Sequence, residues 1–541
     1  MTKNIPKVIL APQARETLKA GFDQMAHALA VTLGPTHGIV LSSTALKSAP
    51  EPITDAATIA RRITALPDRG KNVGAMLMRS LAWRVHQRCG DGSATTAILA
   101  QAILEQASRY VDAGANPVRV QAGIKQAALC AIEALKEMAS PVTCQEQLAS
   151  VAYTATHESE MSFILGEMFD LLGEYAHVTV ENYMAPFLER EYLEGGRWQG
   201  KLVSPHLVSM PGSGKAIAHD CNVALFYGTL SKAEEVLPLI KILAQSERKN
   251  LLLVAQKISD QALNTLVATF VQNRHRLQFV LVDLVRAGEK ARQDLQDLSL
   301  LTGARLLDPQ SGDRLASIQP GDLGSAQRAE ANEEFLLVSG GKDDPAALHE
   351  HFDALNSYLD GLVFDDKEIP EIKMRLGRLA GKMGILKIGA YTQNERDILH
   401  QKAQQGIHVL EAALKGGILP GGGTAYLHCI PFVEAMPYDD EEERMGHQAV
   451  ARALRRPFEQ LLQNAKIPHA GSLAHEITQA KPGLVFDTQR RKILPVEECG
   501  VLDAAQTLMV SLETASSGAQ LALSTDVLVL KRKPKISYQP G

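Results

Sequence analysis

The pattern of hydrophobic and polar positions predicts helices over most of the first 150 residues. Between 14 and 33, apolar side chains recur at steps of three and four, which places them on one face of an amphipathic helix. Gly34-Pro35 then ends the helix. Further helical stretches follow at about 93–111 and 123–139. The positions that carry the first periodicity are Leu18, Phe22, Met25, Leu29 and Leu33.

The middle of the chain has a pattern typical of a parallel sheet. Apolar runs at 223–227, 251–255 and 279–285 have the composition of buried strands. Helical patterns at about 231–247 and 259–273 separate them, so we expect a parallel βαβ layout. Later helices are predicted at about 345–361, 368–380, 394–414 and 445–465. An α/β segment between two α segments indicates an inserted domain, with the outer pieces forming one domain.

Composition narrows the class of protein without naming a function. A chain of 541 residues favours two to four domains. Lys and Arg number 56 against 61 Asp and Glu, a net charge of −5, which excludes a generally basic nucleic-acid-binding surface. Hydrophobic residues make up 45% and charged residues 22%, which excludes wholesale disorder.

The cysteine spacing and the lengths of the apolar runs indicate the cellular environment of the protein. Six widely spaced cysteines without a CxxC pair argue against a zinc site and against a disulfide framework. The first ten residues are too short and polar for a secretory leader, and no apolar stretch has the length of a membrane span. We therefore expect a reducing, cytoplasmic setting and no membrane partner.

Two glycine-rich segments that enter helices are the first candidates for ligand chemistry. These are Gly90-Asp91-Gly92-Ser93-Ala94-Thr95 and Gly421-Gly422-Gly423. Glycines allow close backbone approach, and the N–H groups at a helix start favour an anion. A carboxylate such as Asp91 suits a Mg²⁺ ion that also binds phosphate. The alternatives are a helix N-cap by Asp91 or Ser93 in the first segment and a tight turn in the second.

Two helices of the middle region carry more apolar surface than packing on a sheet requires. In 233–244 and 260–271 the apolar positions cover well over half of the circumference. One stripe of about 100° is enough to cover a sheet. The surplus indicates either a second buried interface or an exposed binding patch.

Taken in order, these features resemble the group I chaperonins, the GroEL-type family. The resemblance spans about residues 10–530, with strongly diverged sequence between motifs. The motifs that match at family separations are Val31-Thr32-Leu33-Gly34-Pro35, Ile53-Thr54-Asp55, Gly90-Asp91-Gly92-Ser93-Ala94-Thr95, Gly421-Gly422-Gly423 and Gly500-Val501-Leu502-Asp503.

The resemblance implies an α+β multidomain fold with three nested domains. An all-α equatorial domain (1–138 and 416–541) binds ATP. An intermediate hinge domain (139–193 and 383–415) relays its state, and an α/β apical domain (194–382) binds polypeptide.

The resemblance also implies the site residues. ATP and Mg²⁺ are the cofactors, with K⁺ left open; Asp91 holds the Mg²⁺ and Asp503 lies near the ribose. The nucleotide contacts are Thr32, Leu33, Gly34, Pro35, Asp91, Gly92, Ser93, Ala94, Thr95, Gly421, Gly422, Asp487, Thr488 and Asp503. The polypeptide contacts are Leu202, His206, Leu207, Leu237, Ile240, Leu263, Val267 and Ala268, where two aromatic family positions are here Leu202 and His206. The surplus apolar surface is thereby interpreted as a binding patch.

At the hydrolytic position the chain departs from the family. The family aspartate lies sixteen residues before the triple glycine, where this chain has Gln405, and a shift by one gives Gln404. The nearest acids, Asp397 and Glu411, are about two helical turns away, beyond side-chain reach. A glutamine can orient a water but cannot accept its proton as a carboxylate does. Asp55, implied to lie near the attacking water, is retained, so we expect ATP to bind and hydrolysis to be strongly slowed.

Other departures concern charge and assembly. Two family lysines near phosphate are replaced by Thr36 and Thr54. An inter-subunit Arg–Glu pair matches Gly200 and Gln393, and the sequence KRKPKISYQPG at 531–541 stands where bacterial members have a Gly-Gly-Met tail. We expect altered nucleotide affinity and altered communication around the ring.

Three functions remain at this point. The first is an ATP-binding chaperonin that captures non-native polypeptides and assists their folding in a ring of identical subunits, heptameric in one or two rings, with a GroES-type lid left open. The second is a hydrolysis-deficient paralogue that acts as a holdase or as a subunit of mixed rings. The third is a metabolic enzyme, disfavoured because no GxGxxG follows a middle strand and no catalytic His, Cys or Lys constellation appears there.

Overall fold

The computed structural model describes residues 7–36, 38–43, 51–209, 214–273, 276–341, 345–362, 368–480 and 483–530. Two compact units are present. The outer unit comprises Met1–Glu174, Asn182–Leu188 and Ile388–Gly541, and the inserted unit comprises Tyr175–Glu181 and Glu189–Lys387. The inserted unit thus interrupts the outer one in sequence, while the finer division into three domains stays a prediction.

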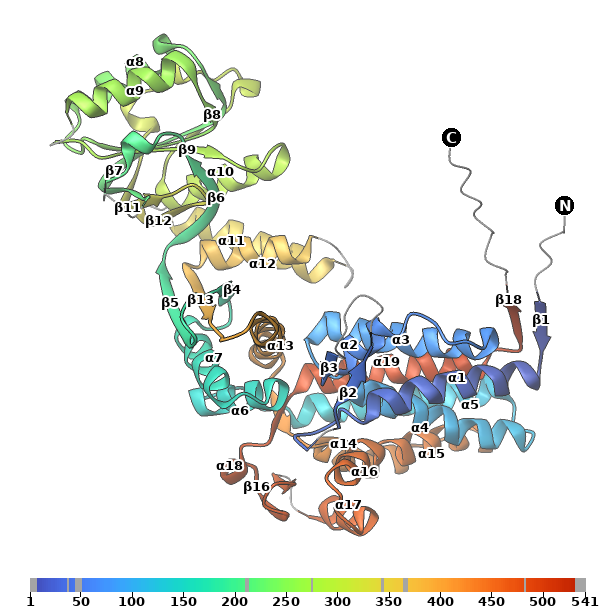
Figure 1. The fold of residues 1–541 in the computed structure, drawn as a ribbon. Coiled ribbons are helices and arrows are strands. Elements are labelled where there is room, and N and C mark those ends of the chain that lie inside the picture. The colour runs from blue at the N-terminus through green and yellow to red at the C-terminus, as the bar shows by residue number, and fades with distance from the viewer. Residues whose placement is uncertain are drawn as a thin grey trace. The chain divides into compact units, whose positions relative to one another are not determined.

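Helices make up most of the outer unit (Figure 1). They are α1 (Gln13–Ala30), α2 (Ala56–Arg62), α3 (Arg69–Cys89), α4 (Ser93–Asp112), α5 (Pro117–Met138), α6 (Gln145–Thr156), α7 (Ser159–Leu172), α13 (Gln393–Gly416), α14 (Thr424–Glu434), α15 (Glu441–Ala453), α16 (Arg456–Asn464), α17 (Ala470–Gln479), α18 (Val496–Cys499) and α19 (Ala505–Leu523). No helix within the described residues is both long and apolar enough to cross a bilayer.

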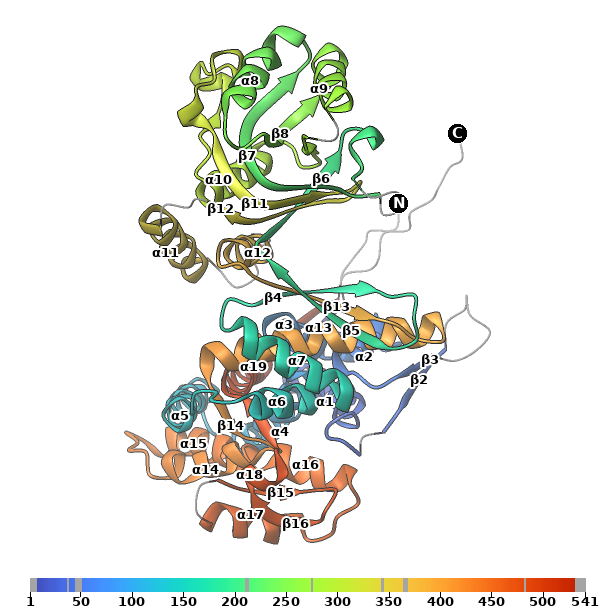
Figure 2. The same ribbon diagram turned by 90° about the vertical axis from the view of Figure 1, so that its left-hand side faces the viewer.

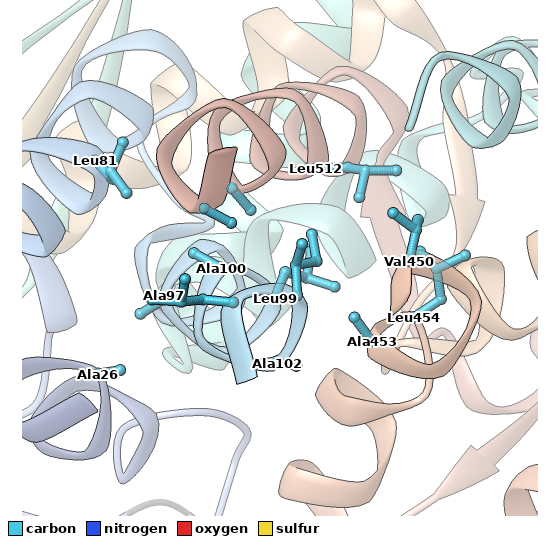
Figure 3. Close-up of a cluster of buried hydrophobic side chains, with 14 of the residues drawn as sticks. Ala26, Leu81, Ala97, Leu99, Ala100, Ala102, Val450, Ala453, Leu454 and Leu512 are labelled. Atoms are coloured by element: carbon cyan, nitrogen blue, oxygen red, sulfur yellow. The ribbon is translucent and has the colours of Figure 1, made fainter. Parts of the chain in front are cut away.

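Helix α4 forms the centre of the outer unit's core. Its buried side chains point in all directions around the helix, as expected for a helix enclosed by its neighbours. Figure 3 shows Ala97, Leu99, Ala100 and Ala102 of α4 beside side chains from α1, α3, α15 and α19. Small alanine side chains let these helices approach closely. The packing fixes the start of α4, where the first glycine-rich segment lies.

Two predicted helix boundaries were wrong for local reasons. Helix α1 ends at Ala30 rather than at 33, because the chain turns ahead of Gly34, which has a φ of 89°. The helix predicted at 445–465 is two helices, α15 and α16. Pro457 lies in the first turn of α16, where proline is favoured, and its ring would clash inside a continuous helix.

Short antiparallel strand pairs join distant parts of the outer unit. They are β1 (Lys7–Leu10) with β18 (Val527–Leu530), β2 (Val40–Ser42) with β3 (Glu51–Ile53), β14 (Ile418–Pro420) with β17 (Leu502–Ala504), and β15 (Leu484–Asp487) with β16 (Lys492–Pro495). The β14–β17 pair places the triple glycine beside Asp503, because Leu419 and Asp503 are direct partners.

The parallel βαβ prediction for the inserted unit is confirmed. Strand β7 (Ala216–Leu230) pairs in parallel with β8 (Asn250–Ile258), which pairs in parallel with β9 (Phe279–Leu284). Helices α8 (Ala233–Gln245) and α9 (Asp260–Gln272) connect them and pack against each other (Figure 2).

The other strands of the inserted unit were not predicted from the sequence. Antiparallel β6 (Gly196–Leu202), β11 (Gly324–Ala331) and β12 (Phe335–Gly341) link β9 back to β7 and so close the sheet on itself. Strand β10 (Leu306–Leu307) pairs with β7, and a separate sheet contains β4 (His177–Asn182), β13 (Lys382–Ile388) and β5 (Leu188–Glu194). The remaining helices are α10 (Glu289–Thr302), α11 (Pro345–Gly361) and α12 (Ile369–Leu379). Short 3₁₀ turns lie at Pro205–Leu207, Pro309–Ser311, Leu315–Ser317 and Pro320–Asp322.

Candidate functional site

The first glycine-rich segment joins two helices and leaves the second without a side-chain cap. Gly90 ends α3 with a φ of 72°. Gly92, with a φ of 90°, is the N-cap of α4, and no side chain caps that helix. The hydroxyl of Ser93 instead donates to the carbonyl of Ala82 at 2.9 Å. Capping by Asp91 or Ser93 therefore does not occur, and the first N–H groups of α4 are available to an anion.

The triple glycine builds a second uncapped helix start. Gly422 and Gly423 have φ values of 65° and 80°, and Gly423 is the N-cap of α14 without a side-chain cap. A Cβ at Gly423 would lie 2.8 Å from the backbone nitrogen of Phe458. Glycine is required here both by the backbone conformation and by the close approach of α16.

Asp503 lies at the triple glycine and is influenced by the charge of Asp91 in the first segment. Its Cγ would lie 3.1 Å from a Cβ at Gly421, and its carboxylate accepts a hydrogen bond from the N–H of Gly422. Restricted hydration, together with the charge of Asp91, raises the pKa of Asp503 to about 7.

Asp91 is the other carboxylate between the helix starts. Its side chain is open to solvent on one side and crowded by protein on the others. The resulting loss of hydration raises the pKa of Asp91 to about 6, with a smaller contribution from the charge of Asp55. The charge of Asp91 raises the pKa of Asp503, and the charge of Asp55 raises that of Asp91, so a cation at these carboxylates would stabilise their ionised forms.

Helix α16 contacts both the predicted turn at Thr32–Pro35 and the triple glycine, and no sequence motif indicated this role. The side-chain amide of Asn464 donates to the carbonyls of Ala30 and Leu33 at 2.9 and 2.8 Å. A Cβ at Gly34 would lie 2.3 Å from the side chain of Leu461, and one at Gly422 would lie 3.6 Å from it. The predicted turn from Thr32 to Pro35 and the triple glycine therefore share one support.

The hairpin that carries Asp487 and Thr488 packs on the same helix. Phe486 of β15 contacts Phe458 of α16 edge to face, with ring centroids 6.4 Å apart. Both Asp487 and Thr488 are buried, and Asp487 accepts hydrogen bonds from the backbone N–H groups of Gln489 and Arg490 at 2.8 and 2.9 Å. The side chain of Asp487 thus holds its own turn.

The predicted hydrolytic residues lie around Gly90 and the start of α2. Asp55 is the N-cap of α2 and accepts from the N–H of Thr58 at 2.7 Å. Gln405 lies on α13, and its carbonyl oxygen would be 3.0 Å from a Cβ at Gly90. The helix that carries the substituted position therefore contacts the residue next to Asp91.

The acids nearest to Gln405 on its helix interact with their own neighbours. Asp397 accepts from the side-chain amide of Gln393 at 2.7 Å. Glu411 lies 3.8 Å from Nδ1 of His408. Neither is placed to substitute for a carboxylate at 405.

These features fit a magnesium nucleotide. Two uncapped helix starts supply N–H donors for phosphate, and the glycines leave room for it. Within the described residues, no cluster of three or more His, Cys, Asp or Glu side chains could hold a metal by itself. A Mg²⁺ ion at Asp91 would therefore need phosphate oxygens among its ligands, as Mg²⁺ commonly has.

The surplus apolar surface of α8 and α9 is divided between core and exterior. Val236, Leu239 and Leu243 of α8 are buried, as are Ala262, Leu266 and Phe270 of α9. Leu237 remains 42% exposed and Val271 54% exposed. Ile240, Leu263 and Val267 are partly buried, and Ala268 is exposed. The core uses one stripe of each helix, and a second apolar stripe remains outside it.

Two residues expected at this surface lie in the core instead. Leu202 is 7% exposed and Leu207 is fully buried. Leu202 ends β6, where alternate side chains point inward, and Leu207 lies in a 3₁₀ turn that packs against the core. His206, between them, is exposed. The accessible part of the expected surface thus excludes both leucines.

Comparison with known proteins identifies the family. The sequence model of the TCP-1/cpn60 chaperonin family matches residues 25–175 and 228–533, so the chain belongs to the chaperonin family. Among solved structures, the chaperonin gp146 of bacteriophage EL 2 (Pseudomonas aeruginosa), in the presence of ATP-BeFx, is similar in two crystal forms. Form I has 17% identity and a TM-score of 0.69, and form II has 16% and 0.61; each match covers 97% of this chain and 99% of the other. The expected chaperonin fold is thereby confirmed.

Membership of this family supports a chaperone role. Ring oligomers and the binding of unfolded polypeptides are implied by the family.

Proposed function

We propose that the protein is an ATP-binding chaperonin subunit that captures non-native polypeptides in a ring and assists their folding in the cytoplasm, with slow hydrolysis. The observation that carries the nucleotide part is that α4 and α14 start without a side-chain cap beside Asp91 and Asp503, and that the charge of Asp91 acts on Asp503. Because the family match covers most of the chain, a chaperone role for this site is preferred over a metabolic one.

Each part of the nucleotide site has its own task in this proposal. The N–H groups that start α4 and α14 bind phosphate, with Ser93, Ala94 and Thr95 in the first turn of α4. Asp91 holds Mg²⁺, which neutralises phosphate charge; a K⁺ ion is left open. The Thr32–Pro35 turn encloses the nucleotide, Asp503 binds the ribose, and Asp487 and Thr488 line the base.

Slow hydrolysis follows from Gln405. A carboxylate at this position would accept the proton of the attacking water, and an amide only orients that water. Asp55 remains as the second acidic group of the site. We therefore expect bound ATP to persist and to act more as a conformational ligand than as a rapidly consumed fuel.

The capture surface is the outer apolar stripe of α8 and α9. Leu237, Ile240, Leu263 and Val267 supply apolar area, with Ala268 and His206 as further contacts. Unfolded polypeptides expose apolar side chains that such a surface would cover.

Exposed apolar strands support assembly with other copies of the chain. In the β1–β18 pair, Val8 lies opposite Val529 and Leu10 opposite Val527, and all four are at least 45% exposed. A face of this kind on a soluble protein is typical of an interface. We propose rings of seven copies, in one or two rings, with a GroES-type lid as a further partner.

A second candidate is a holdase or mixed-ring subunit without productive turnover. At Gly200 a Cβ would lie 2.5 Å from a methyl group of Val282, so a larger residue there would displace the Val282 side chain. Gln393 binds Asp397 of its own helix. The ionic contact expected between subunits is therefore lost at both positions, which favours altered partners or altered cooperativity.

Three measurements test the proposal. Calorimetry with Mg·ATP measures nucleotide binding, negative-stain imaging shows whether rings form, and light scattering shows whether the protein suppresses aggregation of a diluted unfolded protein. The proposed function predicts a positive result in all three measurements. ATP-dependent release of the bound unfolded protein would distinguish it from a holdase. Monomers that bind neither ATP nor unfolded protein would contradict it.

A further inference from the structure

Two histidines lie beside Gly90, the residue that contacts Gln405. His86 lies in the last turn of α3, where its carbonyl accepts a hydrogen bond from the N–H of Gly90 at 2.8 Å. His408 lies one turn beyond Gln405 on α13, and its Cβ would be 2.7 Å from a Cβ at Gly90. Both histidines therefore adjoin the residue that precedes Asp91.

The imidazole of His86 is held in one orientation. It stacks on Trp83 with ring centroids 5.2 Å apart, and the guanidinium of Arg61 lies 4.7 Å from the centroid of Trp83. Nδ1 of His86 is enclosed and has no hydrogen-bond partner among the described residues. Nε2 is therefore the nitrogen that we expect a water molecule to reach. A fixed ring with one accessible nitrogen suits a proton acceptor.

Burial favours the neutral form of this imidazole at physiological pH. Burial lowers the pKa of His86. The carboxylate of Asp55 and a hydrogen bond with the backbone of Gly90 oppose this, and the charges of His408 and Arg61 add to the lowering. Two acids on neighbouring helices have partners of their own, since Glu513 of α19 binds Arg88 at 3.2 Å and Glu411 of α13 lies 3.8 Å from His408. A neutral imidazole can accept a proton, which the amide of Gln405 cannot.

We propose that His86 accepts the proton of the water that attacks the terminal phosphate of ATP, in place of the carboxylate missing at Gln405. The inference rests on the proposed ATP site. The water oxygen forms a bond to the γ-phosphorus, the bond between that phosphorus and the ADP oxygen breaks, and the water proton passes to Nε2 of His86. Gln405 orients the water, and the carboxylate of Asp55 stabilises the imidazolium.

The kinetic test uses kcat at saturating Mg·ATP between pH 5 and 9. We expect the kcat of the unaltered protein to rise with pH as the imidazole loses its proton. His86→Asn should lower kcat by about 10²-fold and remove this rise, because the group that titrates is gone. His408→Asn is the matched control, since it removes the other imidazole at Gly90. The rise of kcat with pH should remain in this variant, with its midpoint at higher pH because the charge of His408 no longer lowers the pKa of His86. Gln405→Asp in the His86→Asn background should restore turnover. The rise of kcat with pH should then occur at lower pH, because a carboxylate loses its proton at lower pH than an imidazole.

A second readout does not depend on turnover. Protonated histidine quenches the fluorescence of a stacked tryptophan, so Trp83 in a Trp198→Phe background reports the charge of His86. A non-hydrolysable ATP analogue with Mg²⁺ should raise the midpoint of this titration, because the terminal phosphate stabilises the imidazolium, and ADP should raise it less.

The outcomes separate this inference from the proposed function. If calorimetry shows no ATP binding, the proposed function itself fails. If ATP binds but the analogue leaves the Trp83 midpoint unmoved, or His86→Asn retains the kcat and its rise with pH, His86 is not the proton acceptor. Loss of the rise in His408→Asn alone would assign the role to His408 and overturn the inference for His86.

Discussion

Gln405 and Gly90 are in backbone contact, with the carbonyl of Gln405 placed 3.0 Å from where a Cβ at Gly90 would be. Helix α13 thus brings position 405 to the segment that carries Asp91, and the residue it brings is an amide. The contact explains why a substitution more than 300 residues from Asp91 in sequence (405 − 91 = 314) is expected to control turnover.

Gln405→Asp should raise steady-state ATP hydrolysis. A carboxylate at this position supplies a proton acceptor, and general-base catalysis contributes about 10²–10⁴-fold, so we expect an increase of about tenfold or more in kcat. ATP affinity should change little, because the interaction forms in the transition state. Phosphate release measured at saturating Mg·ATP checks this.

The neighbouring Gln404 provides a control for added negative charge. Its side chain is exposed, whereas that of Gln405 is half-buried. Gln404→Asp should leave kcat unchanged. An equal increase in kcat in Gln404→Asp and Gln405→Asp, or no increase in either variant, would contradict the role given to position 405.

Leu237→Ser should weaken the capture of unfolded protein. Leu237 is 42% exposed on α8, outside the buried stripe, so the change removes apolar area from the proposed surface with little loss of core packing. Suppression of aggregation should therefore fall while the thermal unfolding midpoint is retained. Val285→Ser is matched, since Val285 is also in the inserted unit, is 60% exposed and lies outside α8 and α9. A similar loss in both variants would mean that α8 is not a specific capture surface.

Gly423→Ala should impair both ATP binding and stability. Gly423 has a φ of 80°, which costs an alanine about 1–2 kcal/mol, and the added Cβ would press on the backbone of Phe458 at 2.8 Å. The strain should displace the start of α14 and lower ATP affinity, measured by calorimetry. Gly471→Ala is the control, because nothing lies within 4 Å of its Cβ and its helix should gain slightly in stability. Unchanged affinity in Gly423→Ala would argue against phosphate binding at this loop.

Sequence periodicity was sufficient for the elements whose burial follows a simple pattern. The helices near 93–111 and 123–139 and the parallel strands β7, β8 and β9 have continuous apolar stripes or runs, so the period alone reveals them. The antiparallel strands β6 and β11 contain charged and small residues, and their pairing is decided by tertiary neighbours.

The candidate site shows the same division between local and distant information. The glycine loops could be found from the sequence because an unusual backbone requires glycine locally. Asn464 could not be found, because its hydrogen bond to Leu33 joins residues that are 431 positions apart and no motif marks it. Leu202 and Leu207 were assigned to the surface by resemblance, but their burial depends on how β6 and its following turn pack.

The raised carboxylate pKa values predict opposite effects of pH on the empty and the occupied protein. The pKa values of Asp91 and Asp503 are about 6 and 7 in the folded state and 3.8 as reference values, so between these limits the folded state binds more protons than the unfolded state. The contribution of these two groups to stability is therefore lost as pH rises from about 4 through about 7. The proposed contacts of Asp91 with Mg²⁺ and of Asp503 with the ribose favour the ionised carboxylates, so Mg·ATP binding should release protons and tighten over pH 6–7.

The measurement is the thermal unfolding midpoint with and without Mg·ATP at pH 5.5 and pH 8. The rise in midpoint on adding nucleotide should be larger at pH 8, where no proton has to leave Asp91 or Asp503. Asp503→Asn is the control, because an amide does not titrate, and it should reduce the difference between the two pH values while the fold is retained. A nucleotide effect that is independent of pH in the unaltered protein would show that Asp91 and Asp503 do not contact bound Mg·ATP, because ionisation of these two groups would then play no part in binding.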